Sequence, residues 1–379
     1  MTRIVAISDF CAPLPVAPPS KDYAAHSAVW ERVAAGGGRP PSPLPVVGGY
    51  LERLPLAAVR AGLCESAEVW TFSGTDDGAS AAFEGAQPLQ RRFRADGPAP
   101  YASTDVLAHL DIFGPPAILC TWGLGVDEDV LARCGDSVRV YNSIDAPALR
   151  IPPSVSRHID LFLASAAWQE AEIHARHPGA LVAVMPIGPE FASPETFFPT
   201  GAAKDVDVIY VAAAQRYKRH DVLLDAFARL PRSIRGLCVF GYGEDAASIR
   251  AEIAARGLSI ECIGPPGVNH SQVNALMNRA RIGVVCGEDD GAPAILTEYM
   301  LAGLPVLANE RLRCGLDFIR PETGLAAPAG AFDKAILALL ARAPSMAPRD
   351  VVLENWVWER TIERFASYVD QARRRKRAA

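Results

Sequence analysis

The feature that most constrains this chain is a regular alternation of short apolar runs with amphipathic segments, which occurs twice along the sequence. In the second half, the apolar run DVDVIYVAAA (205–214) precedes the helical pattern RHDVLLDAFARLP (219–231). The alternation continues through the apolar runs GLCVFGYGE, IECIGPP, IGVVCGE and LPVLAN. Apolar runs that alternate with helices of about 10 to 15 residues are typical of parallel sheets with helices on both faces. We therefore predict an α/β chain.

The first half carries its own series of apolar runs, so the chain is expected to form two Rossmann-like domains. A length of 379 residues is sufficient for two such domains. We predict an N-terminal domain over 1–199, with a proline-rich insertion at 11–47, and a second domain over 200–350. The expected strands of the first domain are RIVAIS, AEVWTF, PAILCTW, VRVYNS, DLFLAS and LVAVMPIG. Ligands of open parallel sheets bind beyond the carboxyl ends of the strands, which predicts a cleft between the domains.

Charge and cysteine content exclude several classes of protein. A net charge of −5 and a pI near 5.9 argue against a dedicated nucleic-acid binder. The basic run RRRKR (373–377) is expected to be a solvated end, and contact with an anionic membrane surface is the alternative. Eight cysteines without C-x-x-C spacing predict free thiols in a reducing compartment and no metal site. With no signal-peptide layout and no long uncharged apolar run, we expect a cytoplasmic protein.

Polar residues follow the predicted strands of the second half. Arg216 and Lys218 come after DVIYVAAA, the turn GYGE contains two glycines, and GEDDGAP (287–293) precedes a predicted helix over Pro293–Ala302. Cations near the amino end of a helix, at strand ends, would form a diphosphate site, although an exposed basic loop is the alternative. Glu298 could accept the two hydroxyls of a ribose. Alternatively, it is a partly buried helix acid with a local partner.

The order of these motifs resembles a known family. The segments YKRHDVLLDAF and GYGED, and Asp290-x7-Glu298 followed by YMLAGLPVLAN, are similar to the donor-binding domain of retaining GT-B glycosyltransferases of the family 4 type (glycosyl transferases group 1). The closing segment NWVWERTIERFASYV resembles the helix with which that family returns to its first domain. The first half fits more loosely, through GGYLERL, LASAAWQEAEI and VMPIGPE.

The resemblance implies a GT-B fold and a specific reaction. Two Rossmann-like domains would face a central cleft, and a C-terminal helix within 351–379 would pack on the N-terminal domain. The implied activity is transfer of a hexosyl group from a UDP- or GDP-sugar to a hydroxyl of a glycan, lipid-linked or small-molecule acceptor. The anomeric configuration would be retained, and neither a metal ion nor another cofactor would be required.

The resemblance also assigns roles to individual residues. Lys218 would bind the donor diphosphate, Glu298 the ribose hydroxyls, and Asp290 the hydroxyls of the transferred sugar. Arg216 would supply the charge of a family arginine whose position is occupied here by Ala213. The backbone contacts to the donor would come from Gly291, Ala292 and Pro293 (sugar and phosphates), Gly264 and Pro265 (base), and Gly48 and Gly49 (phosphates).

The acceptor would bind to the first domain. Asn142 or Asp145 lies where the family often has a histidine, at the end of a strand, and either could bind a sugar hydroxyl. Trp30 and His26, in the 11–47 insertion, are suited to stacking on a sugar ring and bonding its hydroxyls. A surface excursion with Trp30 packed against the domain is the alternative. The basic run RRFR (91–94) is expected to be a solvated loop, and contact with an anionic acceptor is the alternative.

Two other classes of function share this architecture. One is a nucleotide-sugar epimerase, and the other is a non-catalytic subunit that retains the fold. Ala213, Asp290 and Asn142 depart from the family pattern and favour the non-catalytic subunit. The presence of both Lys218 and Glu298 favours the transferase.

Overall fold

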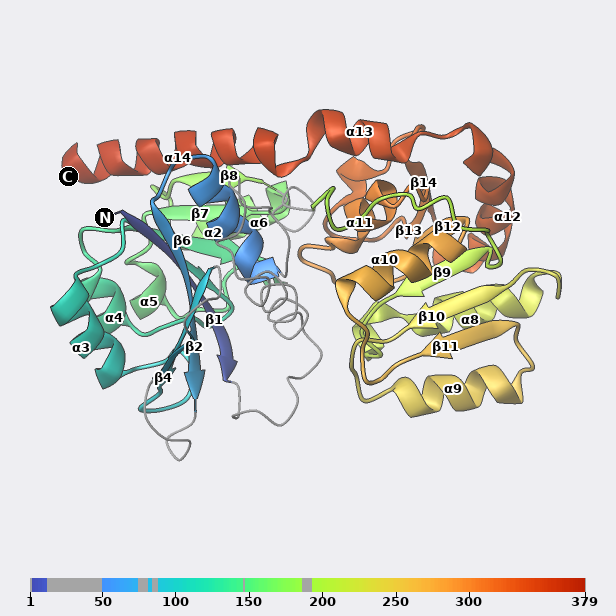
Figure 1. Ribbon diagram of the computed structural model, residues 1–379, viewed down its shortest axis with the longest axis horizontal. Helices are drawn as coiled ribbons and strands as arrows, with labels where there is room; N and C mark the ends of the chain where they lie inside the picture. The colour runs from blue at the N-terminus through green and yellow to red at the C-terminus, as the bar shows by residue number, and fades with distance from the viewer. Residues whose placement is uncertain are drawn as a thin grey trace, which may run out of the picture. The chain divides into compact units, whose positions relative to one another are not determined.

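The structure is a computed structural model, and it describes residues 2–11, 50–73, 81–83, 88–145, 147–185 and 193–378. These residues form two compact units (Figure 1). The first unit contains the described residues up to 185 together with 358–378, and the second contains 193–357. The chain therefore returns to the first unit at Trp358, as expected for the C-terminal helix.

The described part of the first unit is built on a sheet of eight strands in the order β3-β4-β2-β1-β5-β6-β7-β8. All neighbours are parallel except β3, which is antiparallel to β4 at the edge of the sheet. We had not predicted this edge hairpin. The strands are β1 (Arg3–Cys11), β2 (Ser66–Ser73), β3 (Ala81–Phe83), β4 (Leu89–Arg94), β5 (Ile118–Trp122), β6 (Val138–Ser143), β7 (Leu161–Ala164) and β8 (Val182–Val184).

Helices cover both faces of this sheet. On one face, apolar side chains of the sheet such as Tyr141 and Phe162 pack against α3, α4, α5 and α6. Each helix contributes a buried residue to this core: Val106, Val130, Val155 and Ile173, respectively. On the other side, α2 contacts β1 and β2, and α14 contacts α2, β6 and β7. The helices are α2 (Tyr50–Arg60), α3 (Thr104–Phe113), α4 (Glu128–Arg133), α5 (Pro153–Ser156), α6 (Ala167–Arg176) and α14 (Trp358–Ala378).

The second unit is a six-stranded sheet with the order β11-β10-β9-β12-β13-β14, and every pair of neighbours is parallel. The order reverses between β9 and β12, which makes this the switch point where open parallel sheets bind ligands. The strands are β9 (Val208–Val211), β10 (Gly236–Val239), β11 (Ile260–Ile263), β12 (Ile282–Val285), β13 (Val306–Asn309) and β14 (Gly324–Ala327).

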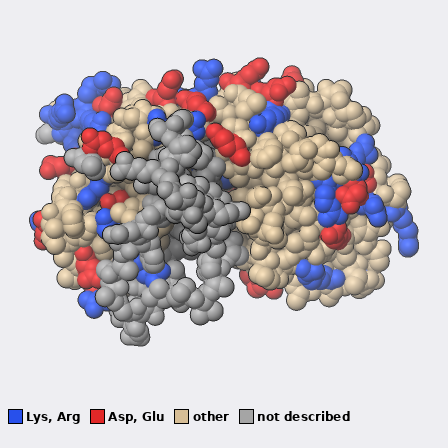
Figure 2. Space-filling view, viewed as in Figure 1, with Lys and Arg blue, Asp and Glu red and all other residues tan. Residues whose placement is uncertain are grey.

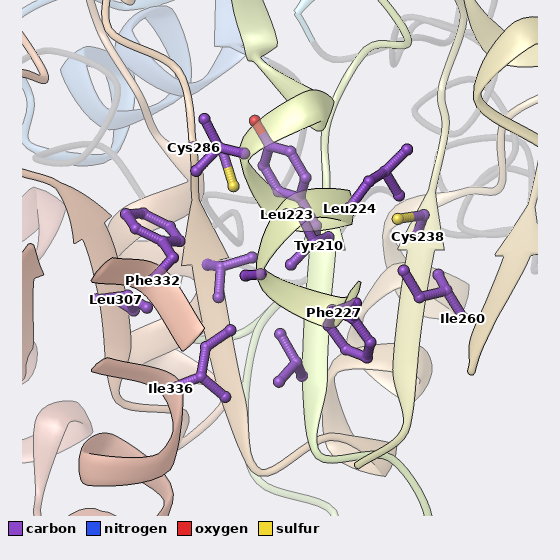
Figure 3. Close-up of a cluster of buried hydrophobic side chains, with 14 of the residues drawn as sticks. Tyr210, Leu223, Leu224, Phe227, Cys238, Ile260, Cys286, Leu307, Phe332 and Ile336 are labelled. Carbon is purple, nitrogen blue, oxygen red and sulfur yellow. The ribbon is translucent and has the colours of Figure 1, made fainter. Parts of the chain in front are cut away.

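Two apolar cores hold the second unit together, one on each face of the sheet. Figure 3 shows the first, in which Phe227 of α8 and Phe332 and Ile336 of α12 pack against the sheet. The second core packs α10, α11 and α13 on the other face. The helices are α8 (His220–Arg229), α9 (Ala246–Ala255), α10 (His270–Arg279), α11 (Ile295–Leu301), α12 (Phe332–Arg342) and α13 (Pro348–Asn355), with short 3-10 turns η1 (Arg216–Lys218), η2 (Leu316–Phe318), η3 (Ala329–Ala331) and η4 (Ala343–Ser345).

The boundaries between the two units, as their internal contacts define them, differ from the predicted domain boundaries. Residues 193–199, which we assigned to the first domain, lie in the second unit, because Phe197 is fully buried in its core. Arg349 donates hydrogen bonds to the carbonyl oxygens of Phe197 and Leu301, at 2.8 and 2.5 Å. Helix α13 also belongs to the second unit, so only Trp358 and the residues after it pack on the first.

The RRFR segment forms a strand, β4, where we had expected a solvated loop. Arg91 forms an ion pair with Glu68 of β2 at 2.9 Å, and the indole of Trp70 donates a hydrogen bond to the same carboxylate at 2.7 Å. Glu68 is buried, so these two partners offset the cost of removing its charge from water. The sequence of β4 alone does not indicate that Arg91 has a buried partner, Glu68, on the neighbouring strand.

Candidate functional site

The carboxyl edge of the second sheet brings together the loops that follow β9, β10, β11 and β12. Glycines allow these loops to touch through their backbones. A Cβ atom on Gly243 would lie 2.2 Å from the carbonyl oxygen of Ala214, and one on Gly264 would lie 2.1 Å from that of Phe240. A Cβ on Gly287 would lie 3.0 Å from the carbonyl oxygen of Tyr217. The loops at this edge are therefore packed backbone to backbone, and there is no room for a side chain at Gly243 or Gly264 and little at Gly287.

Lys218 and Asp290, both predicted site residues, form an ion pair at this edge. Their side chains are only 16% and 14% exposed, respectively. Burial is the largest effect and lowers the pKa of Lys218, but the charge of Asp290 and its hydrogen bond, together with Tyr217 and Tyr242, outweigh burial, and the pKa is raised overall. The Lys218 ammonium also lies 4.8 Å from the centre of the Tyr217 ring. A charged lysine at the switch point is suited to neutralising a diphosphate. In this structure the carboxylate of Asp290 lies where a phosphate would contact the lysine.

A second charged group lies beside this pair. Arg219 has a left-handed backbone, with φ of 54°, and is the only such non-glycine residue in the described chain. Its guanidinium contacts Asp221 at 2.9 Å and Glu288 at 2.8 Å. Arg311, from the loop after β13, approaches the same Glu288 carboxylate at 3.5 Å. Glu288 therefore links the loops after β9, β12 and β13.

His220 follows this turn and is buried between two rings. Its centroid lies 4.8 Å from that of Tyr210 and 5.4 Å from that of Phe240. Neither ring nitrogen makes a hydrogen bond in the part of the chain that the structure describes. Burial, reinforced by the charge of Lys218, lowers the pKa of His220 to about 4. The imidazole is therefore neutral at physiological pH and belongs to the supporting core.

Ala213 occupies the position, five residues before Lys218, at which the resembled family has an arginine. Arg216 was predicted to supply the missing charge. Ala213 is buried, so the position carries no charge. Arg216 begins the turn η1 and is exposed, without an ion pair to any residue that the structure describes. Arg216 is thus available to a ligand, two positions before Lys218.

The three acids at 288–290 each face a cation. Glu288 and Asp290 have the partners described above, and Asp289 lies 3.9 Å from Arg313. Within the described ranges, no three His, Cys, Asp or Glu side chains are grouped closely enough to hold a metal ion. The geometry of these acids is that of an ion-pair network.

Helix α11 is shorter than predicted and begins differently. It spans seven residues, Ile295–Leu301, where we had expected Pro293–Ala302. The N–H of Ala294 donates to the carbonyl oxygen of Ala292 at 2.9 Å, which makes a tight turn before the helix. This turn uses an N–H that could otherwise meet an anion, while Gly291 and Pro293 are buried and Ala292 is half-buried. Glu298 lies in the first turn of the helix, half-buried.

The loop predicted to meet the base lies at the outer side of the same edge. Gly264 has φ of 75° and is half-buried, and Pro265 is exposed. Arg250 of α9 donates hydrogen bonds to the carbonyl oxygens of Cys262, at 3.2 Å, and of Gly264. The loop is therefore held in place by a side chain from the neighbouring helix.

The prediction missed Asn309, the last residue of β13, and Arg311 and Arg313, which follow it. The Asn309 amide donates to the carbonyl oxygen of Cys286 at 2.9 Å and accepts from the N–H of Arg311 at 3.0 Å. The backbone N–H of Arg313 donates to the carbonyl oxygen of Glu288 at 2.9 Å. A buried asparagine at a strand end followed by two arginines was the signal in the sequence.

In the first unit, Asn142 lies at the carboxyl end of β6 and is fully buried. Neither its amide oxygen nor its amide nitrogen makes a hydrogen bond with any residue that the structure describes. A buried amide without partners costs free energy, so this position is a candidate for a ligand hydroxyl. Asp145 is half-buried and contacts Arg150 at 3.4 Å, and its carbonyl oxygen accepts a bond from Gln169 at 3.1 Å.

Four predicted residues lie outside the described ranges. They are Gly48 and Gly49, predicted to approach the phosphates, and His26 and Trp30, predicted to meet the acceptor. Their roles remain predictions. Across the described helices, none combines the length and apolar character that a membrane span requires.

Part of the chain matches a protein-family model. Residues 193–346 match the model described as glycosyl transferases group 1. The match covers most of the second unit, including the whole carboxyl edge but not α13, and less than half of the chain. No curated protein matches the sequence.

Several solved structures share the fold at low sequence identity. Sucrose-phosphate synthase from Thermosynechococcus elongatus is 18% identical, with both chains covered over 100% and a TM-score of 0.67. Anabaena Alr3699/HepE, in complex with UDP and glucose, is 12% identical, with 98% of this chain and 100% of that chain covered and a TM-score of 0.64. The pneumococcal O-GlcNAc transferase GtfA, in complex with UDP and GlcNAc, is 12% identical, with a TM-score of 0.53, and the match covers 72% of this chain and 60% of that one. These likenesses and the two parallel-sheet units confirm the predicted fold class, α/β of the GT-B type.

Proposed function

We propose that this protein is a glycosyltransferase that moves a sugar from a nucleotide-diphosphate sugar to an acceptor hydroxyl, with retention of the anomeric configuration. The observation that carries the proposal is the position of Lys218 and Asp290. They lie at the switch point of the sheet, within the segment that matches the glycosyl transferases group 1 model. The complexes of Alr3699/HepE and GtfA with UDP support UDP as the first donor to test, with GDP second.

In this mechanism the protein positions the two substrates and stabilises charge on the leaving diphosphate. Lys218 and Arg216 would neutralise the phosphates, after Asp290 has released the lysine and turned towards the hydroxyls of the transferred sugar. Glu298 would hold the ribose, and the backbone at Gly264 and Pro265 would meet the base. We propose no metal ion, because Glu288, Asp289 and Asp290 are already paired with cations.

The acceptor would bind to the first unit, where the buried Asn142 amide would bond one of its hydroxyls. Asp145, His26 and Trp30 are further candidates, and the class of acceptor can be a glycan, a lipid-linked sugar or a small molecule. Seven free cysteine thiols in the described residues support the proposed cytoplasmic location, since such thiols persist in a reducing compartment.

The first test is a thermal-shift screen of UDP, GDP and ADP with their common sugars, on the wild type and Glu298→Ala. A ligand at 100 times its dissociation constant adds about 2.7 kcal/mol to stability, which is readily detected. A shift for one nucleotide family that Glu298→Ala reduces would support the donor site. No shift with any nucleotide would count against it.

Product analysis separates the three candidate activities. A transferase forms a new glycosidic bond to an added acceptor, and the anomeric coupling constant of the product reports retention. An epimerase converts the donor sugar without an acceptor. A non-catalytic subunit would bind nucleotide and form no product. The neutral Ala213 and the ion pair of Asp290 with Lys218 favour this alternative.

A further inference from the structure

An exposed apolar pair ends helix α3 of the first unit. The side chains of Ile112 and Phe113 are 74% and 60% exposed, more than those of any other large hydrophobic residue that the structure describes. The Phe113 ring contacts His109 on one side, with the centroids 4.6 Å apart, and its other side faces solvent. Single exposed hydrophobic residues are common, but two adjacent ones at a helix end form a small anchor.

A basic cluster ends helix α14 of the same unit. Arg373–Arg377 are five consecutive basic residues, of which Arg373 pairs with Asp370 at 3.2 Å and Lys376 with Asp160 at 3.0 Å. Arg374 and Arg377 are exposed and form no ion pair with a described residue. Figure 2 shows Lys and Arg side chains gathered where Figure 1 places the end of α14. The chain as a whole carries a net charge of −5, so this positive charge is local.

Hydrogen bonds place the two features on one edge of the first unit. The Lys376 ammonium donates to the carbonyl oxygen of Ser137 at 2.7 Å, and the Ser137 hydroxyl donates to the carbonyl oxygen of Pro116 at 2.5 Å. Pro116 comes three residues after Phe113, and Ser137 directly precedes β6. The end of α14 and the end of α3 are therefore both fixed at the amino edge of the sheet, on its opposite faces.

We propose that this edge, made of Ile112, Phe113 and Arg373–Arg377, docks on the surface of an anionic lipid bilayer. Stable attachment to a bilayer takes two weak signals, and this edge supplies both, an apolar anchor on one face of the sheet and a polybasic helix end on the other. The helix dipole also favours cations at the end of α14, but it does not account for the exposed apolar pair. Nucleic acid would match the charge and leave Ile112 and Phe113 without a role. The proposal is independent of the glycosyltransferase function.

Vesicle sedimentation of the full-length protein tests the proposal. The vesicles are phosphatidylcholine alone and phosphatidylcholine mixed with phosphatidylglycerol, each at low and high salt. We expect binding to the anionic vesicles only, weakened by salt. Ile112→Ser/Phe113→Ser and Arg374→Gln/Arg377→Gln should each weaken that binding at least about fivefold. Both pairs of residues are exposed, so the variants are expected to fold.

Matched variants elsewhere control for nonspecific loss of apolar surface or charge. Leu337→Ser/Leu353→Ser removes two exposed leucines of the second unit, and Arg232→Gln/Arg360→Gln removes two exposed arginines, one of them at the other end of α14. Both controls should bind vesicles as the wild type does. The proposal is overturned if the wild type does not bind anionic vesicles. It is also overturned if Ile112→Ser/Phe113→Ser and Arg374→Gln/Arg377→Gln bind them as the controls do. Binding to a DNA duplex that only the arginine variant loses would also overturn it.

Discussion

Lys218 and Asp290, 72 positions apart in the chain, form a largely buried ion pair at the switch point of the second sheet. A donor diphosphate that binds Lys218 must compete with this carboxylate. Asp290 has thus two proposed states: it neutralises the lysine when no donor is bound, and it contacts the transferred sugar when the donor is present.

Replacing Asp290 by asparagine should therefore strengthen nucleotide binding. The variant removes both the competing charge and its repulsion of the diphosphate, so we expect UDP to bind about tenfold more tightly, by titration calorimetry. Sugar transfer should become slower, because an amide is a weaker acceptor for sugar hydroxyls. Asp289→Asn, which changes a neighbouring acid that is 67% exposed, is the matched control and should leave the affinity unchanged. Weaker UDP binding by Asp290→Asn would contradict the competition.

Replacing Glu298 tests the ribose contact. Loss of hydrogen bonds to a carboxylate should weaken UDP binding by about tenfold or more in Glu298→Gln. UMP and uridine should lose affinity to the same degree, because the ribose is common to all three. Glu322, an exposed acid in the same unit, provides the control Glu322→Gln. Equal affinities in the two variants would exclude Glu298 from the donor site.

The second sheet could be predicted almost element by element, because its strands are buried on both faces and read as apolar runs. The charged network at its edge could not be predicted in the same way. The left-handed backbone of Arg219 turns its side chain towards Glu288, and nothing in the sequence QRYKRHD indicates that a non-glycine residue adopts this conformation. The ion pair of Lys218 with Asp290 likewise depends on how closely the loops after β9 and β12 pack.

The first unit was harder to predict because its edge strands are irregular in composition. The RRFR run appeared solvated because its charges conceal the strand pattern, and the buried partner of Arg91 is Glu68 on another strand. The buried position of Asn142 could be anticipated from its place at a strand end. That its amide bonds none of the described residues could be found only from the structure.

Acid should destabilise the second unit through His220. Burial lowers the pKa of His220 to about 4, so the folded state resists a proton that the unfolded chain accepts below its ordinary pKa of 6.5. This contribution to stability is fully present above about pH 6.5, decreases as pH falls below that value, and is lost completely once pH has fallen through about 4. Between about pH 7.5 and about pH 5 the loss should be about 2 kcal/mol.

Urea unfolding of the wild type and His220→Phe at these two pH values measures this loss. Phenylalanine fits between the rings of Tyr210 and Phe240 and cannot be protonated. We expect the variant to lose about 2 kcal/mol less than the wild type on acidification. If both proteins lose the same free energy of unfolding, His220 is not the group responsible.

Leucine in place of Asn142 should separate stability from activity. Removing a buried amide that bonds no described residue should stabilise the fold by about 1 to 3 kcal/mol, while transfer falls if the amide bonds an acceptor hydroxyl. Asn278→Leu is the matched control, because Asn278 is also buried but bonds Phe198 and Thr200 at 2.9 and 2.7 Å. That change should destabilise the protein. Loss of stability in Asn142→Leu would mean that the amide has a structural partner.

The two glycines of the GYGE turn should differ sharply in their tolerance of a side chain. Gly243 has φ of 125°, and a Cβ there would lie 2.2 Å from the carbonyl oxygen of Ala214, so Gly243→Ala must shift the backbone of the loop before Lys218. A Cβ on Gly241 would meet no atom of the described residues within 4 Å. We expect Gly243→Ala to cost about 3 kcal/mol or more, and Gly241→Ala to cost less than about 1 kcal/mol, by urea unfolding. UDP affinity should fall in the first variant, because the displaced loop carries Lys218. Equal stability in the two variants would show that the loops after β9 and β10 are not in close backbone contact.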